Sequence, residues 1–249
     1  MTLPASGSIT TTQIRTEIGG SGAVVIPSTE VRTLTGVASG PVVLPNDFWG
    51  KSSLSPAPSG TTLYDSGGGT GGWTYTHSAY AAQTITVEIW GGGGSGASGQ
   101  TGSGKTLVIT YYGGGGAGYS KSNYSIANGG SISGSIGAGG GATGGVNITG
   151  NAGGNTTCSQ TGQTANGGAG GVYGSGGGSG GGASGGNVAN TSGESGNFVS
   201  TPNDLNTSYG GASPNGGARA YGSSAGNAPG GGGNAGNAGG YGRVLIKAA

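Results

Sequence analysis

The sequence has few of the side chains that carry charge or fill a protein core. Among 249 residues there are eight Lys or Arg and seven Asp or Glu, for a net charge of +1. This balance offers no basic surface for nucleic acid. Large apolar residues are also scarce, with two Phe, one Met and three Trp. Apolar burial alone therefore cannot order this chain, because each ordered residue loses about 1–2 kcal/mol of backbone conformational entropy.

Cysteine, histidine and export signals are equally scarce. Cys158 is the single cysteine, which excludes an intrachain disulfide and a cysteine zinc site. His77 is the single histidine and the carboxylates are scattered, so we expect no catalytic site, no cofactor and no metal. The start of the chain lacks the pattern of a signal peptide, and no apolar run is long enough for membrane insertion. The composition looks like that of an extracellular surface protein, yet nothing in the sequence exports the chain. A virion component resolves this tension, because virions assemble inside the cell and leave it by lysis.

Glycine is abundant instead, with 68 residues against an ordinary usage of about 7%. Its spacing is not a strict third, which excludes collagen. A flexible linker is one interpretation. We favour packed segments similar to polyglycine II, because such extended backbones make no internal hydrogen bonds and must pair with neighbours. The tract from Gly167 to Gly186 suits this packing.

Composition divides the chain into three zones. Residues 54–60 form a Pro-rich linker between a module of residues 1–53 and a glycine-rich β domain of residues 61–249. The first zone has signals for short helical turns, beginning near Thr10, Pro27 and Asn46, joined by extended segments. Phe48 and Trp49 are large apolar residues in a module too small to bury them well, so they are candidates for docking to a partner. Replacing them by Ala would cost about 3–5 kcal/mol each if they are fully buried.

Period-2 patterns in the third zone predict strands. The fold is expected to be mainly β, with a β-sandwich-like domain that has Ile85, Val87 and Ile89 on its inner face. The expected strands lie near residues 73–77, 84–90, 106–112, 131–136 and 243–247.

One motif matches a phosphate-binding loop by letter. Residues 99–106 read GQTGSGKT, which fits the pattern GxxxxGK[ST]. Such a loop needs a following helix whose amides hold the phosphate. Here LVITYY follows, which predicts a strand, so we expect no nucleotide binding.

Three glycine-poor segments interrupt the tracts, at residues 117–128, 155–166 and 193–209, and the second is expected to be a polar loop. Tyr and Asn on a rigid support give contact area at a low entropic cost, as in antibody paratopes. The alternative is that these segments are turns whose tyrosines pack on the bundle. The candidate receptor-binding residues are Phe198, Asn203, Asp204, Tyr209, Tyr119, Lys121 and Tyr124.

Two groups of motifs carry a resemblance. LPASGSITTTQIRTEIG and GPVVLPNDFWGKSS resemble the N-terminal segments of tailed-phage tail and fibre proteins. TITVEIWGGGGSG, GGGGAGY, SISGSIGAGGG and GGYGRVLIK resemble the glycine-rich adhesin domains of phage tails. The resemblance implies a location in the virion tail, docking to other tail proteins, and binding of a host surface receptor, protein or glycan. A homo-oligomer such as a trimer is compatible with it, although the best-known tip adhesins lack this N-terminal segment.

Two other functions stay open at this point. A purely structural virion component, such as a capsid decoration or tail cap, would need no receptor. A polyglycine ice-binding protein would need a flat, regular face of Thr or Ala and a secretion signal.

Overall fold

The computed structural model describes residues 11–17, 33–34, 54–101, 108–145, 147–199 and 208–249. The chain divides into two compact units. The first includes the described residues up to Pro58 together with 77–83 and 126–130, and the second includes 59–76, 84–125 and 131–249.

The first unit contains one short helix, α1 (Thr11–Glu17), with Ile14 buried. It lies where the capping signal after Thr10 predicts a helix. The turns predicted near Pro27 and Asn46 lie outside the described residues, as do Phe48 and Trp49. Asn128 donates from its Nδ2 to the carbonyl oxygens of Ser78 and Tyr80, which fixes the 77–83 segment in this unit.

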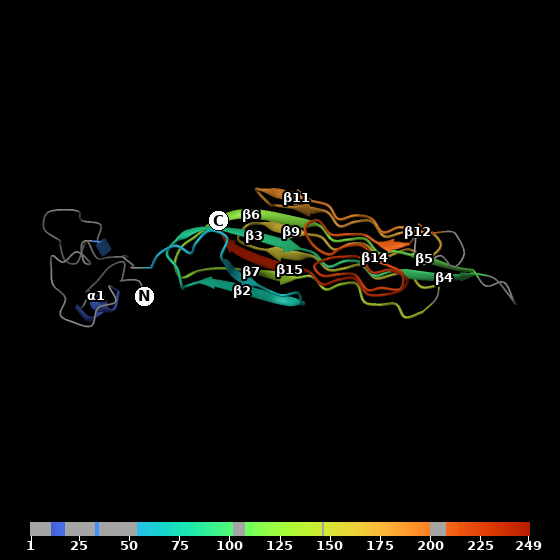
Figure 1. The fold of residues 1–249 in the computed structure, drawn as a ribbon, viewed down its shortest axis with the longest axis horizontal. Helices are drawn as coiled ribbons and strands as arrows, with labels where there is room; N and C mark the ends of the chain where they lie inside the picture. The colour runs from blue at the N-terminus through green and yellow to red at the C-terminus, as the bar shows by residue number, and fades with distance from the viewer. Residues whose placement is uncertain (1–10, 18–32, 35–53, 102–107, 146, 200–207) are drawn as a thin grey trace. The chain divides into compact units, whose positions relative to one another are not determined.

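The second unit contains two five-stranded sheets among its described residues (Figure 1). The order of the first is β1 (Thr62–Asp65), β15 (Arg243–Ala248), β3 (Gln83–Trp90), β6 (Tyr119–Ile126) and β11 (Ala189–Thr191). The order of the second is β10 (Ala183–Ser184), β9 (Gln163–Ala165), β8 (Thr156–Cys158), β7 (Gly130–Ile136) and β2 (Gly71–His77). These sheets confirm the mainly β, sandwich-like prediction and the strands expected near 73–77, 84–90, 131–136 and 243–247.

The core follows from the alternation along the two central strands. Ile85, Val87 and Ile89 of β3 are fully buried, as predicted, and Val244 and Ile246 of β15 are buried beside them. Each such aliphatic side chain contributes about 1.5–3 kcal/mol when it leaves water. The side-chain amide of Gln163, on β9 of the second sheet, donates to the carbonyl oxygen of Val87 at 3.3 Å, which ties the two sheets together.

Beyond the sheets, the glycine tracts form the packed bundle that the composition predicts. The tract 113–118 shows the pattern, because every third residue donates its N–H to the same neighbour. This three-residue repeat is that of a polyglycine II helix, which rotates by a third of a turn per residue. Gly113 and Gly116 donate to Asn197 and Glu194, respectively. Gly114 and Ala117 donate to Gly233 and Gly230, and Gly115 and Gly118 donate to Ala169 and Asn166, all at 2.8–3.0 Å.

The same tract also accepts hydrogen bonds from three further segments. Gly94 donates to Gly115, Gly178 donates to Gly113, and Gly211 donates to Gly114. Residues 113–118 are thus surrounded by six neighbouring backbones. Hydrogen bonding between main chains replaces side-chain packing in this part of the protein, which explains how a chain with so few large apolar residues folds.

Smaller sheets lie where the bundle tracts end. In the second unit, β12 (Phe198–Val199), β5 (Val108–Tyr112) and β4 (Ala97–Thr101) form a sheet far from β3 and β15 (Figure 1). β13 (Tyr209–Gly210) pairs with β14 (Ala220–Tyr221). The strand predicted from residue 106 begins at Val108 in the described part, so a strand and not a helix follows the phosphate-loop motif, of which residues 102–106 lie outside the described residues.

Candidate binding surface

A first group of aromatic side chains surrounds β12. Phe198 is 45% exposed although it is a large apolar residue. Its ring stacks on that of Tyr112, with 6.1 Å between centroids and 16° between planes. Tyr173 meets Tyr112 edge to face at 6.2 Å, so the three rings hold one another in place. The exposed side of Phe198 is therefore presented on a fixed support.

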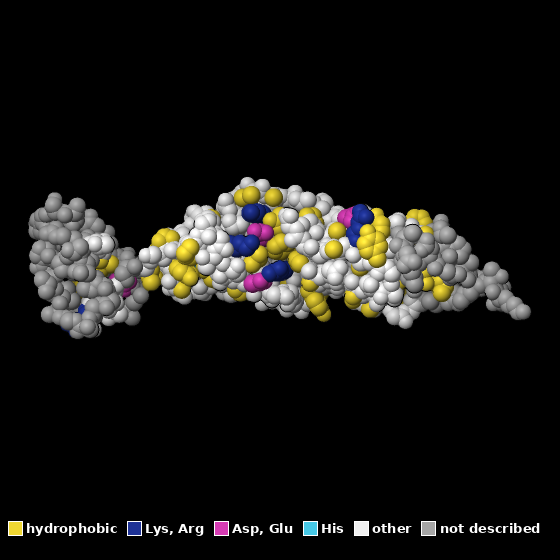
Figure 2. Space-filling view, viewed as in Figure 1, with side chains coloured by type: hydrophobic (Ala, Val, Ile, Leu, Met, Phe, Trp, Pro, Cys, Tyr) yellow, Lys and Arg dark blue, Asp and Glu magenta, His cyan; other side chains and the backbone are white. Residues whose placement is uncertain are grey.

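A second group combines two tyrosines with an ion pair. The rings of Tyr209 and Tyr221 lie 5.8 Å apart, and Tyr221 is 49% exposed. The guanidinium of Arg219 lies 4.3 Å from the centroid of the Tyr209 ring and makes a two-point contact with the carboxylate of Glu194. Glu194 also accepts a hydrogen bond from the backbone N–H of Ala212. On the face seen in Figure 2, charged side chains are few and most of the surface is uncharged.

The ion pair gives this second group a dependence on pH. Hydrogen bonding from Arg219 holds the pKa of the Glu194 carboxyl below its ordinary value of 4.5. A carboxyl group whose pKa is lower in the folded state stabilises the fold above the ordinary value, and this contribution is lost as the pH falls through the folded pKa. The pKa of Asp65 is lowered in the same way by its hydrogen bond to Arg243.

We expect the melting temperature of the protein to fall as the pH drops below 4.5, the ordinary pKa of Glu194, and through its lower folded pKa. Glu194→Gln should keep the contact to Ala212 and lose the charge, so its melting temperature should fall less steeply over this interval. Differential scanning calorimetry of both proteins tests this. Identical slopes of melting temperature against pH for the two proteins would show that the ion pair contributes nothing to stability. Many exposed ion pairs behave in this way.

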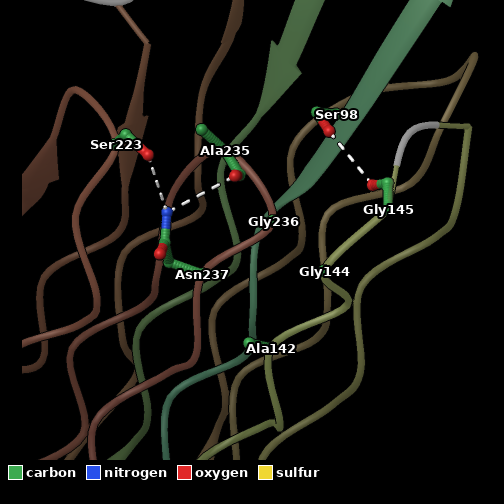
Figure 3. Close-up of a pocket in the computed structure, with 8 residues that line it drawn as sticks. All are labelled: Ser98, Ala142, Gly144, Gly145, Ser223, Ala235, Gly236 and Asn237. Carbon is green, nitrogen blue, oxygen red and sulfur yellow. Dashed lines mark hydrogen bonds between the residues drawn. The ribbon is translucent and has the colours of Figure 1, made fainter.

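A groove of about 550 Å³ opens near the start of β4. Its walls come from segments that are distant in the sequence and are tied across by hydrogen bonds (Figure 3). The hydroxyl of Ser98 donates to the carbonyl oxygen of Gly145 at 3.2 Å. The backbone N–H of Thr143 donates to the carbonyl oxygen of Gly236 at 3.0 Å. The lining residues are Ser98, Ala142, Gly144, Gly145, Ser223, Ala235, Gly236 and Asn237, none of them charged.

The structure separates the residues predicted to bind a receptor. The rings of Phe198 and Tyr209 pack in different aromatic groups, although Asn197 donates its backbone N–H to the carbonyl oxygen of Tyr209 at 2.9 Å. Residues 193–197 pack into the bundle instead of forming a loop. Asn203 and Asp204 lie outside the described residues. Lys121 and Tyr124 lie on β6, where the Nζ of Lys121 is 3.9 Å from the carboxylate of Glu88.

Two of the glycine-poor segments lie in the sheets. β6 occupies most of residues 117–128. Tyr119 is only 3% exposed, packs on Trp90 at 5.1 Å and donates its hydroxyl to Glu88, so it belongs to the core and has no surface for a receptor. Residues 155–166 form the β8–β9 hairpin instead of a polar loop.

The sequence interpretation did not find Tyr112, Tyr173, Tyr221 or the groove. Tyr112 reads as the end of a strand, Tyr173 follows Val172 within a glycine tract, and Tyr221 lies in the short sequence ARAYGSS. Only the packing of tracts distant in sequence brings them together. An isolated large side chain inside a glycine tract is the one available signal, because it has no room in the interior of the bundle and must lie at its surface or its ends.

The comparisons with protein-family models and with curated proteins find no match to this chain. Among the described residues, no three His, Cys, Asp or Glu side chains come together as metal ligands would. No helix in the described part of the chain has the length and apolar character needed to cross a membrane.

Proposed function

We propose that the protein is a tail-fibre or tail-tip protein of a bacteriophage that recognises the surface of the host cell. The resemblance of its N-terminal and glycine-rich motifs to phage tail proteins supports the tail location. The observation that carries the binding role is the pair of half-exposed aromatic side chains, Phe198 and Tyr221, on a rigid bundle of glycine backbones. Residues 1–53, including Phe48 and Trp49, would dock to other tail proteins.

Exposed aromatic rings on a fixed support are suited to recognition. Buried in an interface, such rings contribute much of the binding energy, and a residue that is already ordered loses little entropy when it binds. The exposed area of Phe198 is not explained by stability, since leaving a large apolar side chain half in water gives up part of the free energy of its burial.

Particles that carry Phe198→Ala and Tyr221→Ala together should adsorb to host cells at least about tenfold more slowly, which corresponds to about 1.4 kcal/mol or more of lost binding energy. The adsorption rate is measured from the decay of free particles. A matched control replaces Val188 and Tyr241, which are 50% and 52% exposed and lie outside both aromatic groups, by Ala. Normal adsorption of the first variant, with normal incorporation into particles, would favour the structural virion component.

A further inference from the structure

We propose that the groove between Ala142 and Asn237 binds a neutral sugar unit. This inference rests on the proposed function and specifies that the host receptor is a glycan. Its volume of about 550 Å³ falls within the range of about 300–1,000 Å³ usual for ligand pockets. The three steps of the argument concern its charge, its hydrogen-bonding groups and its rigidity.

The lining selects against charged and against apolar ligands. No lining residue is charged, so an anion or cation would lose its hydration without gaining a counter-charge. The apolar part of the lining consists of the methyl groups of Ala142 and Ala235 and of glycine backbone, so an apolar ligand finds no large side chain to pack against. A neutral, polar ligand remains.

The polar groups of the groove match a ligand rich in hydroxyls. Ser98 and Ser223 supply hydroxyls, and Asn237 supplies a side-chain amide (Figure 3). Because the Ser98 hydroxyl donates to Gly145 and Nδ2 of Asn237 donates within the groove wall, these two residues offer a ligand the acceptor atoms Ser98 Oγ and Asn237 Oδ1. The hydroxyl oxygen of Ser223 accepts a hydrogen bond from Asn237 Nδ2 at 3.2 Å, which leaves the Ser223 proton for donation to a ligand. Sugar hydroxyls both donate and accept hydrogen bonds, so they match this set of groups.

The groove is formed before any ligand arrives. Ala235 has a φ of 51°, which is uncommon for a residue with a side chain, and Gly236 follows with a φ of 80°. Asn237 holds this turn, because its Nδ2 donates to the carbonyl oxygen of Asn234 at 2.8 Å. A ligand therefore loses little of its binding energy to ordering the protein.

An aromatic residue lies close in sequence to one wall of the groove. Tyr221 is two residues before Ser223, a separation that spans at most about 7 Å of backbone. Its ring is half exposed. A sugar presents C–H faces as well as hydroxyls, and an aromatic side chain beside hydrogen-bonding groups matches both kinds of surface.

Saturation-transfer NMR on the full-length protein tests the proposal directly. The probes are the methyl glycosides of glucose, galactose, mannose and N-acetylglucosamine, with sialic acid as an acidic comparison. At least one neutral glycoside should receive saturation on its ring protons. Ala142→Phe places a ring in the groove and should abolish this transfer, whereas Ala152→Phe, at an exposed alanine outside the groove, should preserve it.

The outcomes separate this proposal from the adhesin function. No transfer to any neutral glycoside, preferential transfer to sialic acid, or transfer that survives Ala142→Phe each overturns the sugar site. Loss of particle adsorption in Ala142→Phe without glycoside binding to the original protein would point to a protein receptor, and also overturns it. Glycoside binding that Ala142→Phe abolishes, together with normal adsorption of that variant, upholds the sugar site and contradicts the adhesin function.

Discussion

Gly115→Ala is expected to unfold most of the glycine-rich domain. A Cβ atom on Gly115 would lie 2.0 Å from the carbonyl oxygen of Ser179 and 2.5 Å from its carbonyl carbon. Inserting a methyl group into a packed core costs about 1–3 kcal/mol when flexible side chains can move aside. Here the obstacle is a backbone that is itself hydrogen-bonded, so the cost should reach several kcal/mol, a large share of a domain stability of about 5–15 kcal/mol.

The same substitution at Gly141 is the matched control. A Cβ atom there would have no neighbouring atom within 4 Å, and the backbone is not in the left-handed region. Gly141→Ala should leave the free energy of unfolding within about 1 kcal/mol of the original, or raise it slightly by restricting the unfolded chain. Urea unfolding followed by circular dichroism measures both. Equal stabilities for the two variants would show that the tracts do not pack as the structure has them.

Two side chains inside the bundle show how close the packing is. Ala117 is fully buried in the central tract, and the position that a Cβ atom on Gly230 would take lies 2.8 Å from its methyl group. The bundle thus admits a methyl group where the facing residue is glycine. Ser95 is likewise buried, and its hydroxyl accepts a hydrogen bond from the backbone N–H of Asn151 at 2.7 Å.

The strands of the core could be predicted from the sequence because they carry a side-chain pattern. Residues 84–90 alternate apolar and polar side chains, and residues 243–247 carry three consecutive apolar side chains between Arg243 and Lys247. The structure buries the apolar side chains of both segments. β6 was missed because its buried positions include Ser120 and Ser122, so the segment reads as polar. Ser120 is satisfied there by hydrogen bonds to Asn190 and Gln163, partners that only the fold reveals.

The existence of a bundle could be predicted, but not the pairing of its tracts. Glycine has no side chain, so one tract resembles another and nothing in the sequence assigns Gly94 to Gly115 or Gly178 to Gly113. The register comes from the strands and turns that each tract continues. The candidate site depends on this pairing, since Tyr112, Tyr173 and Phe198 meet only after three distant tracts have packed. This is why the aromatic groups and the groove were beyond the sequence alone.

Amide hydrogen exchange in residues 113–118 and 167–182 tests the central claim most directly, which is that the glycine tracts form a hydrogen-bonded, rigid scaffold. In the structure each N–H of the tract 113–118 donates to a neighbouring backbone, and five of these six residues are glycine. A flexible glycine linker would exchange at the rate of an unfolded chain.

We predict that the amides of 113–118, and those of 167–182 that donate to a neighbouring backbone, exchange at least about a thousandfold more slowly than in the denatured chain, corresponding to an opening free energy of about 4 kcal/mol or more. The measurement is made by mass spectrometry on the folded, full-length protein, with the urea-unfolded protein as the reference. Exchange over both segments at the reference rate would contradict the packed bundle, and with it the rigid support on which the proposed binding surface depends.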